Sequence, residues 1–332
     1  MDFLKALLGF GKQSEPASPA QPRPAPPASP EPLALVAPRV LVIVCDPILH
    51  APSGLKLSQH MGWNRAQDLS AGFAADILET SNGLGRYQLV QRIEFNEFPV
   101  KVDGFRYTPQ EYISVMKRTS QPHEPDTVNY QDFLARFYIL QRVAANEIDE
   151  VWVLGFPYAG FYESIMGGSG AFFCNGGPLL GTSKCPRRFI IMGFSVERGP
   201  GEMLEAFNHR AESIMEKVYA RATPAANLWN KFIRYDQAFP GQAEVGNVHF
   251  APNSERDYDW GNPRFVDSYC DDWFNFPNFK GVKKQVNCAE WGNGDMRAHH
   301  KWWLKRIPKI AGRTDGVAHN WWQYILDVNR VT

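Results

Sequence analysis

The stretch Arg187–Ala220, RRFIIMGFSVERGPGEMLEAFNHRAESIMEKVYA, decides the fold prediction. Its apolar run Phe189–Val196 has the length and bulk of a strand that is covered on both faces. Gly199-Pro200-Gly201 then breaks the run, and Glu202 opens a sequence of good helix formers. The pattern predicts a buried strand, a tight turn and an amphipathic helix. Because ligands of open α/β sheets bind beyond the carboxyl ends of the strands, the turn is also where a site is expected.

The rest of the first two thirds of the chain repeats this alternation. Further strands are predicted at Val40–Cys45, Tyr87–Phe95 and Val151–Phe156, and helices at Ala66–Glu79, from Thr108 and at Tyr130–Asn146. A final helix is predicted near Trp321–Val328, at the end of the chain. Strands that alternate with helices are typical of a mostly parallel sheet flanked by helices. We therefore predict an α/β fold.

Composition divides the chain into three parts. Residues 1–12 are a short amphipathic segment, and residues 13–38 are a Pro/Ala/Ser-rich linker expected to be disordered. Residues 39–222 form the predicted α/β core. Residues 223–332 are an aromatic-rich, loop-rich extension, expected to pack on the core and to roof the carboxyl edge of its sheet.

The first twelve residues are relevant to whether the protein is attached to a membrane or exported. Their apolar part is too short to cross a bilayer, and they lack the basic start and cleavage site of a signal peptide. They could tether the domain to a membrane surface or a partner, or be a dispensable tail. No transmembrane span is predicted.

Overall charge and aromatic content limit the partners. Formal net charge is zero over 332 residues, which argues against nucleic acid because phosphate binding needs a clustered basic excess. Aromatic residues make up 13% of the chain, and most of the ten Trp lie beyond residue 228. Together with Asn and Asp they suggest either a sugar-binding surface or an irregular aromatic core.

The five cysteines do not decide whether the protein is exported or cytosolic. Cys45 lies within an apolar run and is expected to be a buried thiol. Cys174 with Cys185, and Cys270 with Cys288, form two local pairs without zinc-ribbon spacing. Two disulfides in an exported protein are slightly favoured over free thiols in a cytosolic one, although no signal peptide supports export.

Polar residues gather at the predicted strand ends. Asp46 follows the first strand, Tyr158, Tyr162 and Glu163 follow the third, and Glu197 and Arg198 follow the fourth. If the strands are parallel, two or three carboxylates could share one cleft and act as general acid and base. Arg198 with the backbone of Gly199 and Gly201 would hold an anionic or polar group. The structural alternative is that Asp46 caps a turn, Glu163 is solvated and Glu197 is ion-paired.

The helix after this turn carries Glu205, His209 and Glu212, which resemble metal ligands in type and spacing. At about 100° per residue they lie opposite the apolar arc of the helix, so they are expected to face solvent. They would form a site only if the C-terminal extension covered that face.

The extension holds a second set of candidates. We assign His249 to catalysis, and Asp259, Trp260, Trp291 and His299 to substrate binding. His299 and His300 are also candidates, with His209 and Glu212, for a weakly indicated metal site. No HExxH, GxSxG, Walker or dinucleotide motif is present, so no nucleotide cofactor is indicated and a metal stays open.

These patterns suggest three functions. The first is a hydrolase of a glycan or glycan-like polymer that uses Asp46, Glu163, Glu197 and His249 in acid–base catalysis. The second is a non-catalytic module that recognises carbohydrate or a partner. The third is a metal-dependent hydrolase with His and carboxylate ligands.

Overall fold

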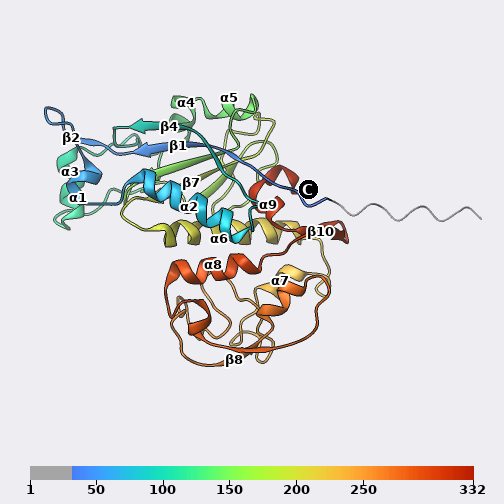
Figure 1. Cartoon of the computed structure of the whole chain (residues 1–332). Helices are drawn as coiled ribbons and strands as arrows, with labels where there is room; N and C mark the ends of the chain where they lie inside the picture. Colours follow the sequence, from blue (N-terminus) through green and yellow to red (C-terminus); the bar gives the residue numbers. More distant parts are fainter. Residues whose placement is uncertain (1–31) are drawn as a thin grey trace, which may run out of the picture. The chain divides into compact units, whose positions relative to one another are not determined.

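A five-stranded sheet forms the centre of the computed structural model, which describes residues 32–332. Its order is β4 (Gln88–Phe95), β1 (Arg39–Cys45), β5 (Glu150–Gly155), β7 (Phe189–Ser195) and β6 (Ser164–Gly167). The first four strands are parallel, and only β6 is antiparallel to its neighbour. The prediction of a mostly parallel sheet with flanking helices is confirmed (Figure 1).

Helices cover both faces of this sheet. Alternate residues of β1 point to opposite sides, with Val40, Val42 and Val44 in one buried cluster and Leu41, Ile43 and Cys45 in the other, as the two-residue period of a strand requires. The first cluster is covered by α2 (Ala66–Thr80) and α6 (Pro200–Val218), and the second by α3 (Pro109–Met116), α4 (Tyr130–Arg136) and α5 (Ile139–Ala144).

The long helix predicted at Tyr130–Asn146 is wrong in one respect, because it is two helices. Tyr138 has a left-handed φ of 53° between α4 and α5, and such a residue interrupts a right-handed helix.

The segment before β1 also differs from the prediction. The expected linker ends before residue 38, since Val36 already bridges to Gly85. The proposed tether at residues 1–12 lies outside the described residues.

The short elements complete the path of the chain. Near the carboxyl ends of the strands lie β2 (Ile48–His50), β3 (Leu55–Lys56) and α1 (Leu57–Met61). The extension contains α7 (Leu228–Phe232), β8 (Val266–Ser268), η1 (Cys270–Asn275), β9 (Lys284–Val286), η2 (Cys288–Trp291), α8 (Met296–Arg306), β10 (Lys309–Thr314), β11 (Val317–Asn320), α9 (Trp322–Leu326) and η3 (Val328–Arg330).

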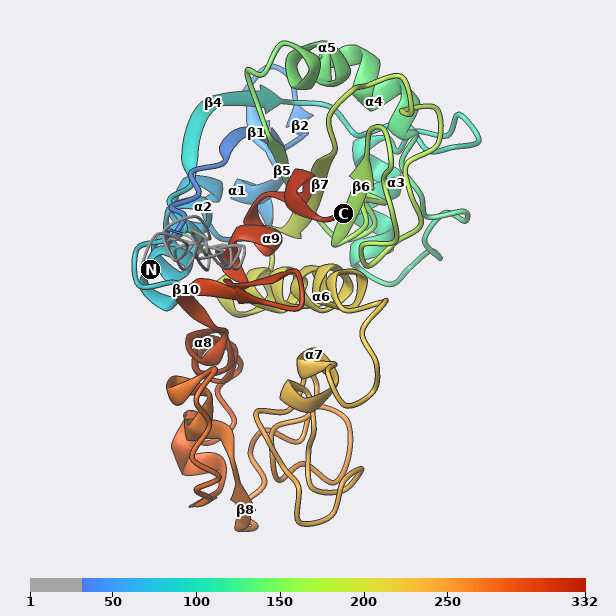
Figure 2. The same cartoon turned by 90° about the vertical axis from the view of Figure 1, so that its right-hand side faces the viewer.

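This extension packs against the outer side of α6 (Figures 1 and 2). Helix α8 lies along α6 and α2, so that α6 is sandwiched between the sheet and the extension. The extension therefore does not mainly roof the carboxyl edge, as expected, but covers the face of α6 that the sheet leaves open. Its tryptophans form the interior of this layer, since Trp229, Trp303, Trp321 and Trp322 are at most 1% exposed.

The disulfide prediction is wrong. All five cysteines are free and buried, and desolvation raises the pKa of Cys45 and Cys174. These thiols fill apolar space.

Every helix in residues 32–332 is too short or too polar to span a bilayer.

Candidate functional site

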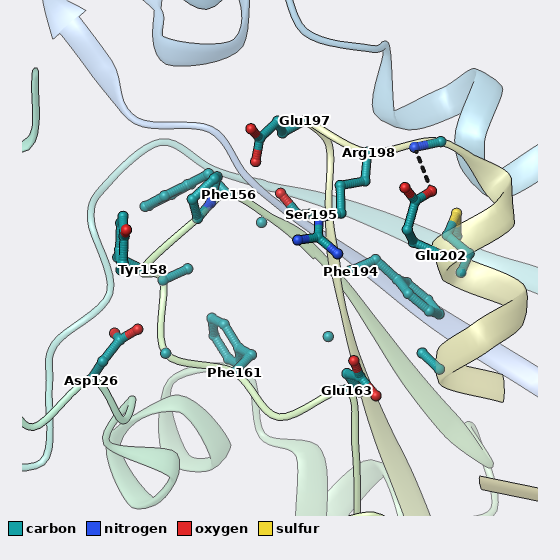
Figure 3. Close-up of a pocket in the computed structure, with 18 residues that line it drawn as sticks. Asp126, Phe156, Tyr158, Phe161, Glu163, Phe194, Ser195, Glu197, Arg198 and Glu202 are labelled. Atoms are coloured by element: carbon teal, nitrogen blue, oxygen red, sulfur yellow. Dashed lines mark hydrogen bonds between the residues drawn. The ribbon is translucent and has the colours of Figure 1, made fainter. Parts of the chain in front are cut away.

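A cavity of 340 Å³ opens where β5 and β7 end (Figure 3). Its lining includes Tyr158, Glu163, Glu197 and Arg198 among the predicted site residues, and Asp126, Phe161, Phe194, Ser195 and Glu202 in addition. We call this cavity the strand-end pocket. Glu163 and Glu197 thus share one pocket, on opposite sides of it (Figure 3).

Two side chains fix the loops that form this pocket. The Asn64 amide donates to the carbonyls of Val196 and Arg198, at 3.1 and 3.0 Å. On the other wall the buried Lys101 ammonium pairs with Asp126 and donates to the carbonyl of Tyr158 at 2.6 Å. Tyr158 itself has a left-handed φ of 59°, a conformation that costs energy in a bulky residue unless its surroundings impose it.

The other strand-end candidates have structural partners. Both carboxylate oxygens of Asp46 accept hydrogen bonds from Ser58, at 2.9 and 2.6 Å, and Asp46 lines a different cavity. Tyr162 is half-exposed and does not line the strand-end pocket. Gly199 also lines the strand-end pocket, but its N–H donates to the Glu202 carboxylate at 3.1 Å. Gly201 packs against Met296 of α8.

A second group of polar side chains lies on the outer face of α6, which was expected to face solvent. That expectation is wrong, because the extension covers this face: Glu205 is only 7% exposed, and His209 and Glu212 are partly buried. His249, from the extension, completes the group. Glu205, His209 and His249 each contribute one ligand atom, and these atoms lie within 4.8 Å of one another. We call these three residues the histidine–glutamate cluster.

The two histidines face each other through their Nε2 atoms, which are 3.0 Å apart. Each ring is held from behind by a carboxylate, with His209 Nδ1 3.0 Å from Glu212 and His249 Nδ1 2.9 Å from Asp257. A carboxylate at Nδ1 favours the proton on that nitrogen and leaves a lone pair on Nε2. The 3.0 Å separation of the two Nε2 atoms is favourable when one of them carries a proton that the other accepts, or when both bind one metal ion.

Glu205 closes the cluster from the side of the strand-end pocket. Its carboxylate lies 3.5 Å from His249 Nε2 and also accepts a hydrogen bond from Tyr258. Burial alone would raise the pKa of Glu205, but these hydrogen bonds outweigh burial and lower it. The Glu205 hydrogen bond in turn raises the pKa of His249. The carboxylate is therefore ionised and available as a ligand near neutral pH.

The loop that carries His249 is anchored to two helices. The second oxygen of Glu212 accepts from the Val248 N–H at 3.0 Å, and Trp303 of α8 donates to the Gly246 carbonyl at 2.9 Å. Gly246 has a φ of 85°, and a Cβ there would lie 2.1 Å from the Phe250 carbonyl, so only glycine fits. Glu212 thus orients one ligand and positions the loop that bears the other.

The cluster and the strand-end pocket adjoin along α6. Glu202 lines the pocket, and at a rise of about 1.5 Å per residue Glu205 lies about 4.5 Å and His209 about 10 Å further along the helix. Tyr258 belongs to the cluster side, since desolvation and its hydrogen bond to Glu205 raise its pKa to about 12. The pocket lining itself includes Glu202, Met203 and Ala206 of α6 but none of the three cluster residues.

The remaining predicted residues of the extension are buried. Trp260 and Trp291 are 5% and 2% exposed, so their faces cannot stack on a substrate at the surface. Asp259 accepts hydrogen bonds from Glu255 and Asn262 and shapes a loop.

His299 and His300 lie fully buried on α8, with their Nδ1 atoms 3.3 Å apart. Desolvation lowers the pKa of His299 to about 3. It also lowers the pKa of His300, to well below the ordinary value of a histidine. Both rings are therefore neutral, and neither belongs to the histidine–glutamate cluster.

Sequence reasoning missed Tyr258 and the pairing of His209 with His249. Forty residues separate these two histidines, and no local spacing reports a contact made through a loop. Comparison with protein-family models, curated proteins and solved structures gave no match. Function is therefore inferred from these side chains alone.

Proposed function

We propose that the chain is a metal-dependent hydrolase in which Glu205, His209 and His249 hold a zinc ion. The observation that carries the proposal is the pair of Nε2 atoms at 3.0 Å, each ring backed by its own carboxylate. Metal-bound histidines in proteins almost always donate their other ring N–H to such a group. A proton shared by the two rings would explain the Nε2–Nε2 distance without a metal, and the zinc titration below distinguishes the two explanations.

The distances suit the ion. Zinc–ligand bonds of about 2.0–2.1 Å in a tetrahedron put neighbouring ligand atoms about 3.3 Å apart. Two of the three distances within the cluster, 3.0 and 3.5 Å, lie on either side of that value, and the third, between Glu205 and His209, is at most 4.8 Å. Two histidines and one glutamate leave the fourth position for water or substrate, as in catalytic zinc sites, whereas structural sites have four protein ligands. The side chains of His209 and His249 are also 19% and 27% exposed, so solvent reaches the cluster.

A zinc ion bound here would supply a water that loses its proton near neutral pH and would polarise a carbonyl or phosphoryl oxygen. Glu212 and Asp257 would keep the histidine rings oriented. Glu163, which accepts from Asn175 at 2.6 Å and faces the pocket, would accept the proton released from the attacking water. The Tyr258 hydroxyl, with its high pKa, would stay a hydrogen-bond donor throughout.

Zinc binding by the purified full chain tests the proposal directly. We expect one zinc per chain, with affinity reduced about 100-fold or more in His209→Ala and in His249→Ala, because each removes one of three ligands. Titration calorimetry measures the affinity. His60→Ala is the matched control, since His60 is exposed on α1 and does not belong to the histidine–glutamate cluster. Absence of stoichiometric zinc, or equal loss in the control, would contradict the proposal.

Turnover is tested with a panel of ester, amide, phosphoester and glycoside substrates, with and without 1,10-phenanthroline. Loss of activity on chelation and recovery with added zinc are expected. Binding of a substrate without any turnover would favour a recognition module instead.

A second candidate is supported by the two carboxylates of the strand-end pocket. Glu163 and Glu197 lie on opposite sides of one cavity, an arrangement that glycoside hydrolases use as acid and base. Glycoside turnover that resists phenanthroline but is lost in Glu197→Gln would establish this function over the first.

A further inference from the structure

The strand-end pocket contains hydrogen-bond donors that the protein does not use. Among the described residues Arg198 has no side-chain hydrogen bond or ion pair, although its guanidinium points into the middle of the pocket beside Ser195 (Figure 3). The hydroxyl of Ser195 is buried and also without a partner. A buried hydroxyl that makes no hydrogen bond is costly, and a guanidinium offers five donors. The Ser195 hydroxyl therefore requires an acceptor, and the Arg198 guanidinium, which is exposed to solvent, is free to bind one.

The carboxylates nearby do not serve as that acceptor, because most have other partners. Asp126 pairs with Lys101, Glu163 accepts from Asn175, and Glu202 accepts from the backbone of Gly199. Glu197 is exposed on the other side of the Arg198 backbone. The backbone itself cannot shift to change this, since Asn64 holds the carbonyls of residues 196 and 198.

We infer that the strand-end pocket binds a carboxylate group of the substrate, through the guanidinium of Arg198 and the hydroxyl of Ser195. Arginine matches a carboxylate with two parallel N–H···O bonds. Four carboxylates line the pocket against this single arginine. These acids repel any anion in the pocket, but they repel a doubly charged phosphate more strongly than a singly charged carboxylate, so the carboxylate is favoured of the two.

This inference deepens the proposed hydrolase function, because the pocket adjoins the histidine–glutamate cluster along α6. It predicts that the bond cleaved belongs to an organic acid, such as an acylated amino acid, whose carboxylate anchors the substrate. The rings of Phe156, Phe161 and Phe194 form the apolar part of the same wall.

Binding of benzoylglycine and of its uncharged analogue benzoylglycinamide tests the inference. The two probes share a shape and differ only in the carboxylate. Calorimetry or ligand-observed NMR on the full chain should show about tenfold tighter binding of the acid, since a charge-assisted bond is worth more than a neutral one. Arg198→Gln should abolish the difference, Ser195→Ala should reduce it, and Arg65→Gln, at an arginine that is largely exposed outside this pocket, should leave it unchanged.

The measurement is made both on zinc-loaded protein and after dialysis against 1,10-phenanthroline, because a carboxylate could also bind the metal. Discrimination that persists without metal and vanishes in Arg198→Gln supports the inference even if the zinc proposal fails. Equal affinity for both probes, discrimination that survives in Arg198→Gln, or displacement of the acid by inorganic phosphate at similar concentration would overturn it.

Discussion

The two faces of α6 bury polar groups in opposite ways. On the sheet side the Arg210 guanidinium is fully buried and pairs with Glu150 of β5, donates to the carbonyl of Ile325 and lies near the hydroxyl of Tyr87. On the outer side His209 and His249 converge with their Nε2 atoms 3.0 Å apart. The first set is closed in charge, because Arg210 and Glu150 neutralise each other even though the Arg210 Nε has no partner, whereas the second brings two ring nitrogens and a carboxylate to one point. A closed network is what a fold needs, and an open one is what a ligand completes.

Breaking the closed network should have the largest effect. Arg210→Met leaves the Glu150 carboxylate buried without its cation, and we expect the free energy of unfolding to fall by about 3–5 kcal/mol. Urea unfolding at pH 7 measures this. The zinc affinity of the folded fraction should be unchanged, because Arg210 points away from the cluster.

The double variant Arg210→Met/Glu150→Leu is the matched control. Removal of both charges should restore most of the lost stability, since no uncompensated charge is left. A single variant as stable as the wild type would show that the sheet side of α6 does not depend on this pair.

Glu244, in the extension, lies between the closed and the open set in how well its charge is compensated. It accepts from Trp273 Nε1 at 2.9 Å, but Lys231 is 3.7 Å away, and desolvation raises its pKa from 4.5 to about 7. The folded chain therefore binds this proton more tightly than the unfolded chain. Stability from this group is complete below about pH 4.5 and falls as pH rises to 7, by on the order of 2–3 kcal/mol.

Glu244→Gln should remove that decline, because the amide stays neutral and its oxygen still accepts from Trp273. The free energy of unfolding, measured from pH 5 to 8, should then favour the variant at the alkaline end. Glu79→Gln is the control: hydrogen bonds from Lys301 and Lys305 lower the pKa of Glu79 to about 2, so the contribution of that group changes only in acid, and this variant should keep the wild-type pH dependence between pH 5 and 8. An unchanged pH dependence in Glu244→Gln would contradict the assignment.

The same contrast explains what could be predicted from the sequence. Strands β1, β5 and β7 and helices α2 and α6 follow from local periodicity, and each was found within a few residues of its predicted bounds. The strand-end pocket followed from the parallel topology, which brings Glu163 and Glu197 to one edge. The cluster did not, because the helical wheel assigns the outer face of α6 to solvent until something covers it. That cover is the extension, and its aromatic residues gave no period from which its position could be derived.

The smallest effect concerns the carboxylates behind the histidines. Glu212→Gln keeps the shape of the side chain and can still accept from the Val248 N–H, but it no longer offers a charged acceptor to His209 Nδ1. Loss of such a supporting group typically lowers metal affinity about 10- to 100-fold, which is less than loss of a ligand. Asp257→Asn should cost less again, because the Asp257 side chain is 56% exposed and its interaction with His249 is weakened by solvent. Zinc titrations of both variants beside His249→Ala rank the three positions. If Glu212→Gln bound zinc as tightly as the wild type, the carboxylates behind the rings would be ordinary surface charges, and the outer face of α6 would lose the feature that distinguishes it from the closed network on the other side.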